Sequence, residues 1–185
     1  MIFNKHSELE GLHAFLGASK YSWIRYDIKK LEEVYRNEIA KQKGTELHEL
    51  ASNMIKHGVQ AKGTKQTLNL FVNDAIGYKM QSEQILYYSP NCFGTADAIS
   101  FKNNFLRIHD LKTGFHPASF DQLKIYAALF CLEYDYKPFD IKMELRIYQS
   151  DQVTIFEPDP DEIAHIMDLI ITFDKKITQI SMEES

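Results

Sequence analysis

Apolar and polar residues alternate along the chain with two different periods, and the changes between them mark the expected elements. A period of three to four residues predicts helices over residues 28–43, 45–57, 65–79, 118–133 and 159–180. A period of two, or a short apolar run, predicts strands over residues 82–88, 93–102, 105–112, 140–149 and 152–156. Gly58 suits the end of the second helix. This order of elements indicates an α/β fold with a mixed central β-sheet flanked by helices.

The chain has the size and apolar content of one domain. Its 185 residues are 44% apolar, enough to bury a core, and we expect a single domain over residues 1–185. No apolar run reaches the roughly 18 residues of a membrane-spanning helix, so no membrane contact is expected. The N-terminus, MIFNKHSELEGLHAF, is charged and lacks the apolar region of a signal peptide. A cytoplasmic location is therefore expected.

Cysteine content and charge limit the classes of function. Cys92 and Cys131 are too few to hold a zinc ion or an iron–sulfur cluster alone. The net charge of −5 argues weakly against a simple electrostatic nucleic-acid binder. The charge is uneven, however: residues 133–185 carry −8 and residues 1–132 carry +3. The basic part of the chain could therefore still contact phosphates.

The acidic helix expected over residues 159–180 carries an apolar stripe. Its members recur at near-helical spacing: Ile163, Ile166, Met167, Ile170, Phe173, Ile177 and Ile180. We expect this stripe to pack on the sheet of its own chain rather than to form a subunit interface. Self-association is left open by the sequence.

A two-residue turn at residues 103–104 (Asn-Asn) sets the register of the two strands around it, because asparagine tolerates positive φ. Counting outward from this turn places Asp97 opposite Asp110, and Thr95 opposite Lys112, all on one face. The pairs nearer the turn on that face are apolar. The two carboxylates therefore emerge together at the far end of the hairpin.

Two opposed carboxylates repel each other unless a positive charge lies between them or one is protonated. A divalent cation would relieve the repulsion between Asp97 and Asp110, and their hard oxygen ligands suit Mg²⁺ or Mn²⁺. Lys112 would then stand beside the metal, where an ammonium group can orient water and stabilise charge in a transition state. This combination is typical of phosphodiester hydrolysis.

The Asp-x-Lys tripeptide alone is weak evidence. The same tripeptide also begins at Asp27, Asp135, Asp140 and Asp174. Only Asp110 has a carboxylate opposite it in an expected hairpin. A register shift of one residue would turn Asp97 to the other face and remove the site.

Four short motifs follow one another in a recognisable order. They are GTELH ending at His48, GTAD ending at Asp97, DLKTG beginning at Asp110, and QLKIY beginning at Gln122. Together they span about residues 44–130 and resemble the RecB-type branch of the PD-(D/E)XK nuclease superfamily. That resemblance implies a restriction-endonuclease-like core.

The resemblance also implies roles for individual residues. His48, Asp97 and Asp110 would bind the metal, with the Leu111 backbone carbonyl as a further ligand. Lys112 would be the catalytic lysine.

Three more positions enter through the same resemblance. Gln122 and Tyr126, one helical turn apart, would face the active site and the DNA strand. Glu83 occupies a place where relatives often carry glutamate and is a further candidate ligand. Taken alone, Gln122 and Tyr126 would be ordinary helix residues, and His48 would more often be a core histidine.

What the resemblance implies is a metal-dependent deoxyribonuclease that hydrolyses DNA phosphodiester bonds. The chain lacks the four cysteines that hold an iron–sulfur cluster in some relatives, and it lacks a helicase region. It is similar to the stand-alone nucleases of bacteriophages and mobile elements, which would place it in the host cytoplasm. DNA would be its substrate and a recombination protein a candidate partner. Exonuclease action is favoured over sequence-specific endonuclease action.

Two other classes of function stay open. The first is a non-catalytic nucleic-acid-binding or scaffold protein on a nuclease fold, although such a protein need not keep the Asp–Asp–Lys set. The second is an α/β interaction protein in which Asp97 and Asp110 pair with basic residues such as Lys112. Metal titration separates this last reading from the others, because it predicts no tight divalent site.

Overall fold

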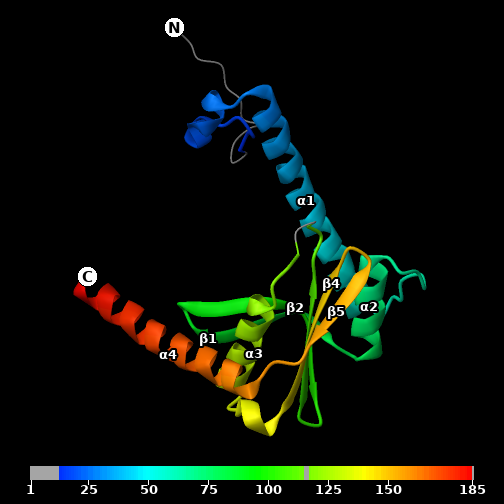
Figure 1. Cartoon of the computed structure of the whole chain (residues 1–185), viewed down its shortest axis with the longest axis vertical. Helices are drawn as coiled ribbons and strands as arrows, with labels where there is room; N and C mark the ends of the chain where they lie inside the picture. The colour runs from blue at the N-terminus through cyan, green and yellow to red at the C-terminus, as the bar shows by residue number, and fades with distance from the viewer. Residues whose placement is uncertain (1–12, 115–116, 185) are drawn as a thin grey trace. The chain divides into compact units, whose positions relative to one another are not determined.

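The computed structural model describes residues 13–114 and 117–184 (Figure 1). Residues 1–12, where no signal peptide is expected, lie outside the described part. The chain divides into a smaller unit, Met1–Lys43, and a larger unit, Gly44–Ser185. No helix in the described ranges has both the length and the apolar character needed to cross a bilayer.

The smaller unit consists of a 3₁₀ segment, η2 (Ala18–Arg25), and the first turns of helix α1 (Ile28–Lys56). The Trp23 indole donates a hydrogen bond to the Gly17 carbonyl at 3.0 Å. The Asp27 carboxylate accepts the Lys30 backbone N–H at 2.7 Å and so caps the start of α1. Local contacts of this kind shape the unit.

Helix α1 is continuous, so the prediction of two helices over residues 28–43 and 45–57 is wrong at their junction. Gly44, between the two predicted ranges, is buried inside the helix. A Cβ atom at Gly44 would lie only 2.8 Å from Thr113 Oγ1, so glycine is needed there for close packing. The helix ends as predicted at Gly58, whose φ is +64°, and the Val59 N–H bonds back to the Met54 carbonyl at 2.8 Å.

Five strands form one mixed sheet in the order β1-β2-β3-β4-β5. The strands are β1 (Gln81–Ser89), β2 (Cys92–Lys102), β3 (Phe105–Leu111), β4 (Lys142–Gln149) and β5 (Gln152–Phe156). Neighbours are antiparallel except for β3 and β4, which are parallel and are joined by helix α3 (Asp121–Glu133). The prediction of an α/β fold with a mixed sheet flanked by helices is therefore confirmed.

The register of the β2–β3 hairpin is also confirmed as far as its ladder extends. Asn103 and Asn104 have φ of 53° and 56°, as a two-residue turn requires. The pairs run without a shift from Lys102 with Phe105 to Ala98 with His109. The next two positions, occupied by the carboxylates, lie just beyond the last pair.

Helices cover both faces of the sheet (Figure 1). Leu106 and Ile108 pack with α3 residues such as Leu123 in one core cluster. On the other face, helix α2 (Thr67–Gly77) and the part of α1 around Ala51 pack on a cluster that includes Tyr148. The predicted site residues lie on α1, on α3 and on, or directly after, the first three strands, between these layers.

The last helix, α4 (Pro160–Glu183), packs mainly on α3 and the short turn η3 (Pro138–Asp140). Ile163 belongs to the core cluster on the α3 face of the sheet, so the predicted packing on the sheet is confirmed only for the first part of the stripe. Asp159 caps the helix by accepting the Asp161 N–H at 2.9 Å. Only Ile163 of its apolar stripe is fully buried.

Candidate metal centre

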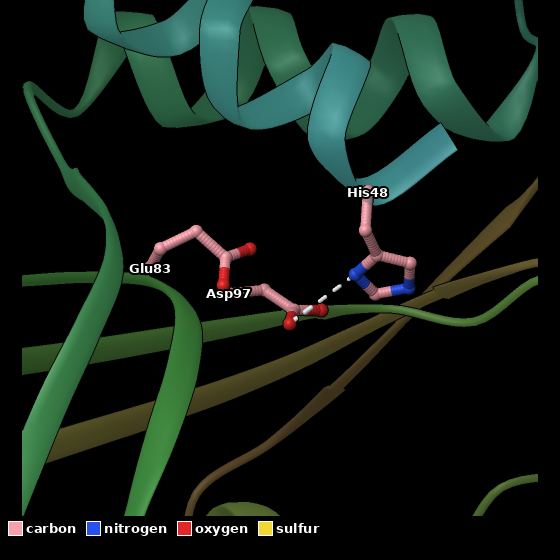
Figure 2. A group of neighbouring side chains, drawn as sticks. All are labelled: His48, Glu83 and Asp97. Atoms are coloured by element: carbon pink, nitrogen blue, oxygen red, sulfur yellow. Dashed lines mark ion pairs between the residues drawn. The ribbon is translucent and has the colours of Figure 1, made fainter. Parts of the chain in front are cut away.

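Three side chains from three different elements meet at one point of the larger unit. His48 comes from α1, Glu83 from β1 and Asp97 from β2, and one ligand atom of each lies within 4.8 Å of the others. Figure 2 shows the His48 ring extending from its helix toward the Asp97 carboxylate, with the Glu83 side chain beside Asp97. His48 Nδ1 lies 3.4 Å from Asp97 Oδ1, and the two side chains are 31% and 14% exposed. Solvent and ions can therefore reach the group, which we call the candidate metal centre.

An irregularity in both strands directs Glu83 and Asp97 to this point. Ala96 packs in the core on the α3 side and Ala98 in the core on the α1 side, so β2 changes the face it presents at Asp97. In β1, Glu83 has φ of +53°. A left-handed backbone is costly at a residue other than glycine and persists where the surroundings enforce it, often at functional sites.

The backbone of β3 holds the second oxygen of Asp97. The Leu111 N–H donates to Asp97 Oδ2 at 2.8 Å. Because the β2–β3 ladder ends at Ala98 and His109, this carboxylate replaces the carbonyl that would otherwise bond to Leu111. Asp97 is therefore fixed at one oxygen and faces His48 with the other.

Beside the candidate metal centre lies a chain of polar contacts that leads from Asp110 to α3. Lys112 Nζ lies 3.1 Å and 3.0 Å from the two carboxylate oxygens of Asp110. The same ammonium donates to Gln122 Oε1 at 2.7 Å, and Gln122 Nε2 donates to the Tyr126 hydroxyl at 3.0 Å. A Cβ at Gly94 would lie 2.8 Å from the Tyr126 ring, so the glycine of the GTAD motif makes room for this tyrosine.

The charges of this region are unbalanced toward the negative. The hydrogen bond that His48 donates to Asp97 raises the pKa of His48 against the opposing effect of burial. Burial and the charge of Asp97 raise the pKa of Glu83. The same two causes raise the pKa of Asp110, although Lys112 and His48 oppose them. Burial is thus the main cause for both carboxylates, and the charge of Asp97 adds to it.

In the described part of the chain, three buried side-chain atoms have no hydrogen-bond partner, and one of them, Asp110 Oδ2, lies at this site. Among the described residues, none donates a well-aligned hydrogen bond to Asp110 Oδ2, although Lys112 Nζ lies 3.0 Å away. Buried oxygens without donors are uncommon and call for an explanation such as a missing ion. Two or three carboxylates with one imidazole fit a divalent cation, and carboxylates suit Mg²⁺ or Mn²⁺. The donor set does not single out one metal.

The predicted residues are brought together in two groups. His48 and Asp97 meet with Glu83, the further candidate. Asp110 is outside this group of three and faces Lys112, but its charge raises the pKa of His48. For Leu111 the structure records its N–H in a contact, whereas the sequence pointed to its carbonyl. The predicted pairing of β2 with β3 could not show the bond from the Leu111 N–H to Asp97, because this bond forms beyond the last pair of the two strands.

The fold and this site define an α/β protein with a five-stranded mixed sheet and a candidate divalent-cation centre between the sheet and α1. Compared with models of known protein families, with curated proteins and with solved structures, the chain matches none. Inferences about its function therefore depend on its own residues and geometry.

Proposed function

We propose that the chain is a metal-dependent deoxyribonuclease of the RecB-type PD-(D/E)XK class, built on a restriction-endonuclease-like core. The observation that supports this proposal is the meeting of His48, Glu83 and Asp97 directly beside the Asp110–Lys112 pair. An acidic group for a cation next to an ammonium group is the arrangement that phosphodiester hydrolysis needs.

In the proposed site, His48, Glu83 and Asp97 hold Mg²⁺ or Mn²⁺, and Asp110 contributes its buried oxygen. A bound divalent cation supplies Lewis acidity and lowers the pKa of water. Asp97 is well suited to its role because the Leu111 N–H already fixes one of its oxygens, which limits the freedom that binding would remove.

Lys112 is the proposed catalytic residue. Its ammonium is held between Asp110 and Gln122, so it has a defined position without being buried. From there it orients the attacking water and offsets the negative charge that develops on the phosphate. The water oxygen bonds to phosphorus as the bond to the 3′ oxygen breaks, which leaves a 5′-phosphate and a 3′-hydroxyl.

Gln122 and Tyr126 are proposed as positioning residues. Gln122 accepts from Lys112 and donates to the Tyr126 hydroxyl, so the pair links the ammonium to the buried face of α3. Loss of either contact would leave Lys112 with Asp110 alone. The exposed side chain of Gln122 is also free to meet the DNA strand.

Digestion from DNA ends is the proposed mode of action. Among the described residues, no second unit of the usual domain size of 50–250 residues accompanies the larger unit. Selection of the substrate by its ends or shape suits this part of the chain. A recombination protein that supplies DNA affinity is a suitable partner for a chain of net charge −5.

A nuclease assay tests the proposal. End-labelled linear DNA and closed circular DNA, single- and double-stranded, are incubated with Mn²⁺, Mg²⁺ or EDTA. We expect metal-dependent loss of linear DNA and survival of circles. Asp110→Ala should abolish the loss, whereas Asp140→Ala, which replaces an exposed aspartate of η3, should not. Absence of cleavage with every metal and substrate would reject the nuclease and favour a non-catalytic nucleic-acid-binding protein.

A further inference from the structure

The apolar stripe of α4 has the spacing of a coiled coil. Successive positions are separated alternately by three and four residues through Ile163, Ile166, Ile170, Phe173, Ile177 and Ile180. A strict repeat of this kind places one apolar seam along a helix, and such a seam is normally covered by another helix. The spacing of the seam therefore suits packing against another helix.

Only the first half of the seam is covered within the larger unit. Ile163 is buried, and Ile166 and Ile170 pack at the edge of the same core cluster. From there on the seam faces solvent: Phe173 is 59% exposed, Ile177 44% and Ile180 41%.

A groove runs beside the exposed half. It has a volume of about 550 Å³ and lies between α3 and α4. Its wall is mainly apolar and includes Ile125 of α3 with Leu169 and Phe173 of α4. Ile125 and Leu169 are themselves 42% and 36% exposed. The side chains of a second helix would find here the holes that coiled-coil packing requires.

We propose that the exposed half of α4 associates with α4 of a second copy of this chain, in an antiparallel pair. Around a two-fold axis the same surface serves both copies. Phe173 then packs against the partner's Ile177, and Ile170 against the partner's Ile180. The alternating spacing of three and four residues is sufficient to place these pairs of side chains opposite one another.

The antiparallel orientation follows from the position of α3. In a parallel pair, the first half of the partner's helix would run along the seam where α3 already lies. In an antiparallel pair, the exposed halves overlap and each body lies beyond the C-terminal end of the other helix. Only the second arrangement leaves the contacts between α3 and α4 intact.

The exposed area fits a dimer that forms and dissociates. Phe173, Ile177, Ile180 and Leu169 leave on the order of 300–400 Å² of apolar surface on each copy. Two copies, with the polar atoms that flank the seams, approach the ~1,200 Å² at the lower end of specific interfaces. The dimer should therefore depend on concentration.

Sedimentation and light scattering of the full chain, over about a hundredfold range of concentration, test the proposal. We expect the mass to rise from that of one chain to that of two. Phe173→Asp and Ile177→Asp should each hold the chain as a monomer. The control Phe139→Asp, at a residue that is 63% exposed on η3, should leave the dimer unchanged. A monomer at every concentration, or a dimer that persists in both seam variants, would overturn the proposal.

Thermal unfolding separates a dimer from coverage of the seam by another part of the same chain. If the chain covers its own seam, wild type is a monomer and Phe173→Asp lowers the melting temperature independently of concentration, which contradicts the proposal. Oxidative cross-linking tests the orientation in a Cys92→Ala background. A mixture of Phe173→Cys and Ile177→Cys chains should cross-link more than either variant alone. The opposite result would indicate a parallel pair.

Discussion

Two clusters in the larger unit combine a histidine with acidic residues, and they differ in whether their charges are balanced. In the candidate metal centre, His48 faces Asp97 and Glu83 at the border of the sheet and is partly open to solvent. In the second cluster, His109 is fully buried on the α2 face of the sheet, with Tyr148, Asp74 and Arg146 around it. We call this second cluster the buried polar network.

In the buried polar network, Asp74, Arg146 and Tyr148 pair with one another. The Tyr148 hydroxyl donates to Asp74 Oδ2 at 2.7 Å, and Arg146 Nη1 donates to the same oxygen at 3.1 Å. Because the hydroxyl proton goes to Asp74, the Tyr148 oxygen accepts from His109 Nδ1 at 3.1 Å. Within the described residues, His109 Nε2 has no partner.

The two histidines consequently shift in opposite directions. The hydrogen bond between the His48 ring and the Asp97 carboxylate raises the pKa of His48. Burial, with the charges of Arg146 and Arg107, lowers the pKa of His109 to about 3. The difference indicates that an open group with excess carboxylate can accept a cation. A closed group whose carboxylate already meets an arginine stabilises the fold instead.

The largest expected effect tests the proposed catalytic role of Lys112 separately from metal binding. Lys112→Ala should lower the rate of metal-dependent DNA hydrolysis by about 10²–10³-fold or more, because it removes a positioned donor at the reacting phosphate. Metal affinity should stay nearly unchanged, since Lys112 is not a ligand. Single-turnover cleavage together with Mn²⁺ titration measures both. Lys142→Ala, at an exposed position of β4, is the matched control. Undiminished cleavage by Lys112→Ala would reject the mechanism.

Equivalent histidine substitutions compare stability in the two regions. His109→Ala should lower the free energy of unfolding by about 2–4 kcal/mol, because it leaves a cavity and removes the donor to Tyr148. His48→Ala should cost less than about 1 kcal/mol, because the side chain is 31% exposed. Urea unfolding of both variants gives the two values. Equal losses would show that the clusters do not differ as described.

The pH dependence of stability tests the lowered pKa of His109. Its pKa falls from 6.5 to about 3, so between these values the unfolded chain binds a proton that the folded protein does not. Stability should therefore fall as the pH falls through this window, by up to about 1.4 kcal/mol per pH unit from this group. His109→Asn should show a slope shallower by about one proton in urea unfolding at several pH values. An unchanged slope would place the titration elsewhere.

The smallest expected effect is that of replacing Asp110, and replacing Asp74 should change the free energy of unfolding in the opposite direction. The raised pKa of Asp110 means that its ionised form destabilises the fold at neutral pH. Without added metal, Asp110→Asn should therefore raise the free energy of unfolding by about 1 kcal/mol. Asp74→Asn should lower it by about 1–3 kcal/mol, because Asp74 accepts from Arg146 and Tyr148. Destabilisation by both substitutions would remove the distinction between the regions.

Most of the fold could be predicted because its elements have clear hydrophobic periods. The hydrophobic periods located the five strands and helices α2, α3 and α4, and the Asn-Asn turn fixed the β2–β3 register. The failures concern long-range packing. The continuous helix α1 was predicted as two helices, and no local pattern reveals that Thr113 approaches it at Gly44. Nor does a local pattern reveal that α3 is the main neighbour of α4.

The candidate site shows the same limit. Asp97, Asp110 and Lys112 were found because the register of one hairpin relates them. The left-handed backbone of Glu83 and the Leu111 N–H contact could not be predicted, because both occur where regular pairing stops. Nor did the sequence point to the buried polar network, since Asp74 and Tyr148 lie 74 positions apart with no motif that connects them.

Calorimetric titration of Mn²⁺ into the metal-free protein tests most directly whether the open cluster is a cation site. We expect one Mn²⁺ binding event in wild type and in Asp74→Asn, since Asp74 belongs to the buried polar network. Asp97→Asn should weaken the affinity at least about tenfold, which corresponds to 1.4 kcal/mol or more. Absence of binding in wild type, or equal binding in Asp97→Asn, would contradict the account.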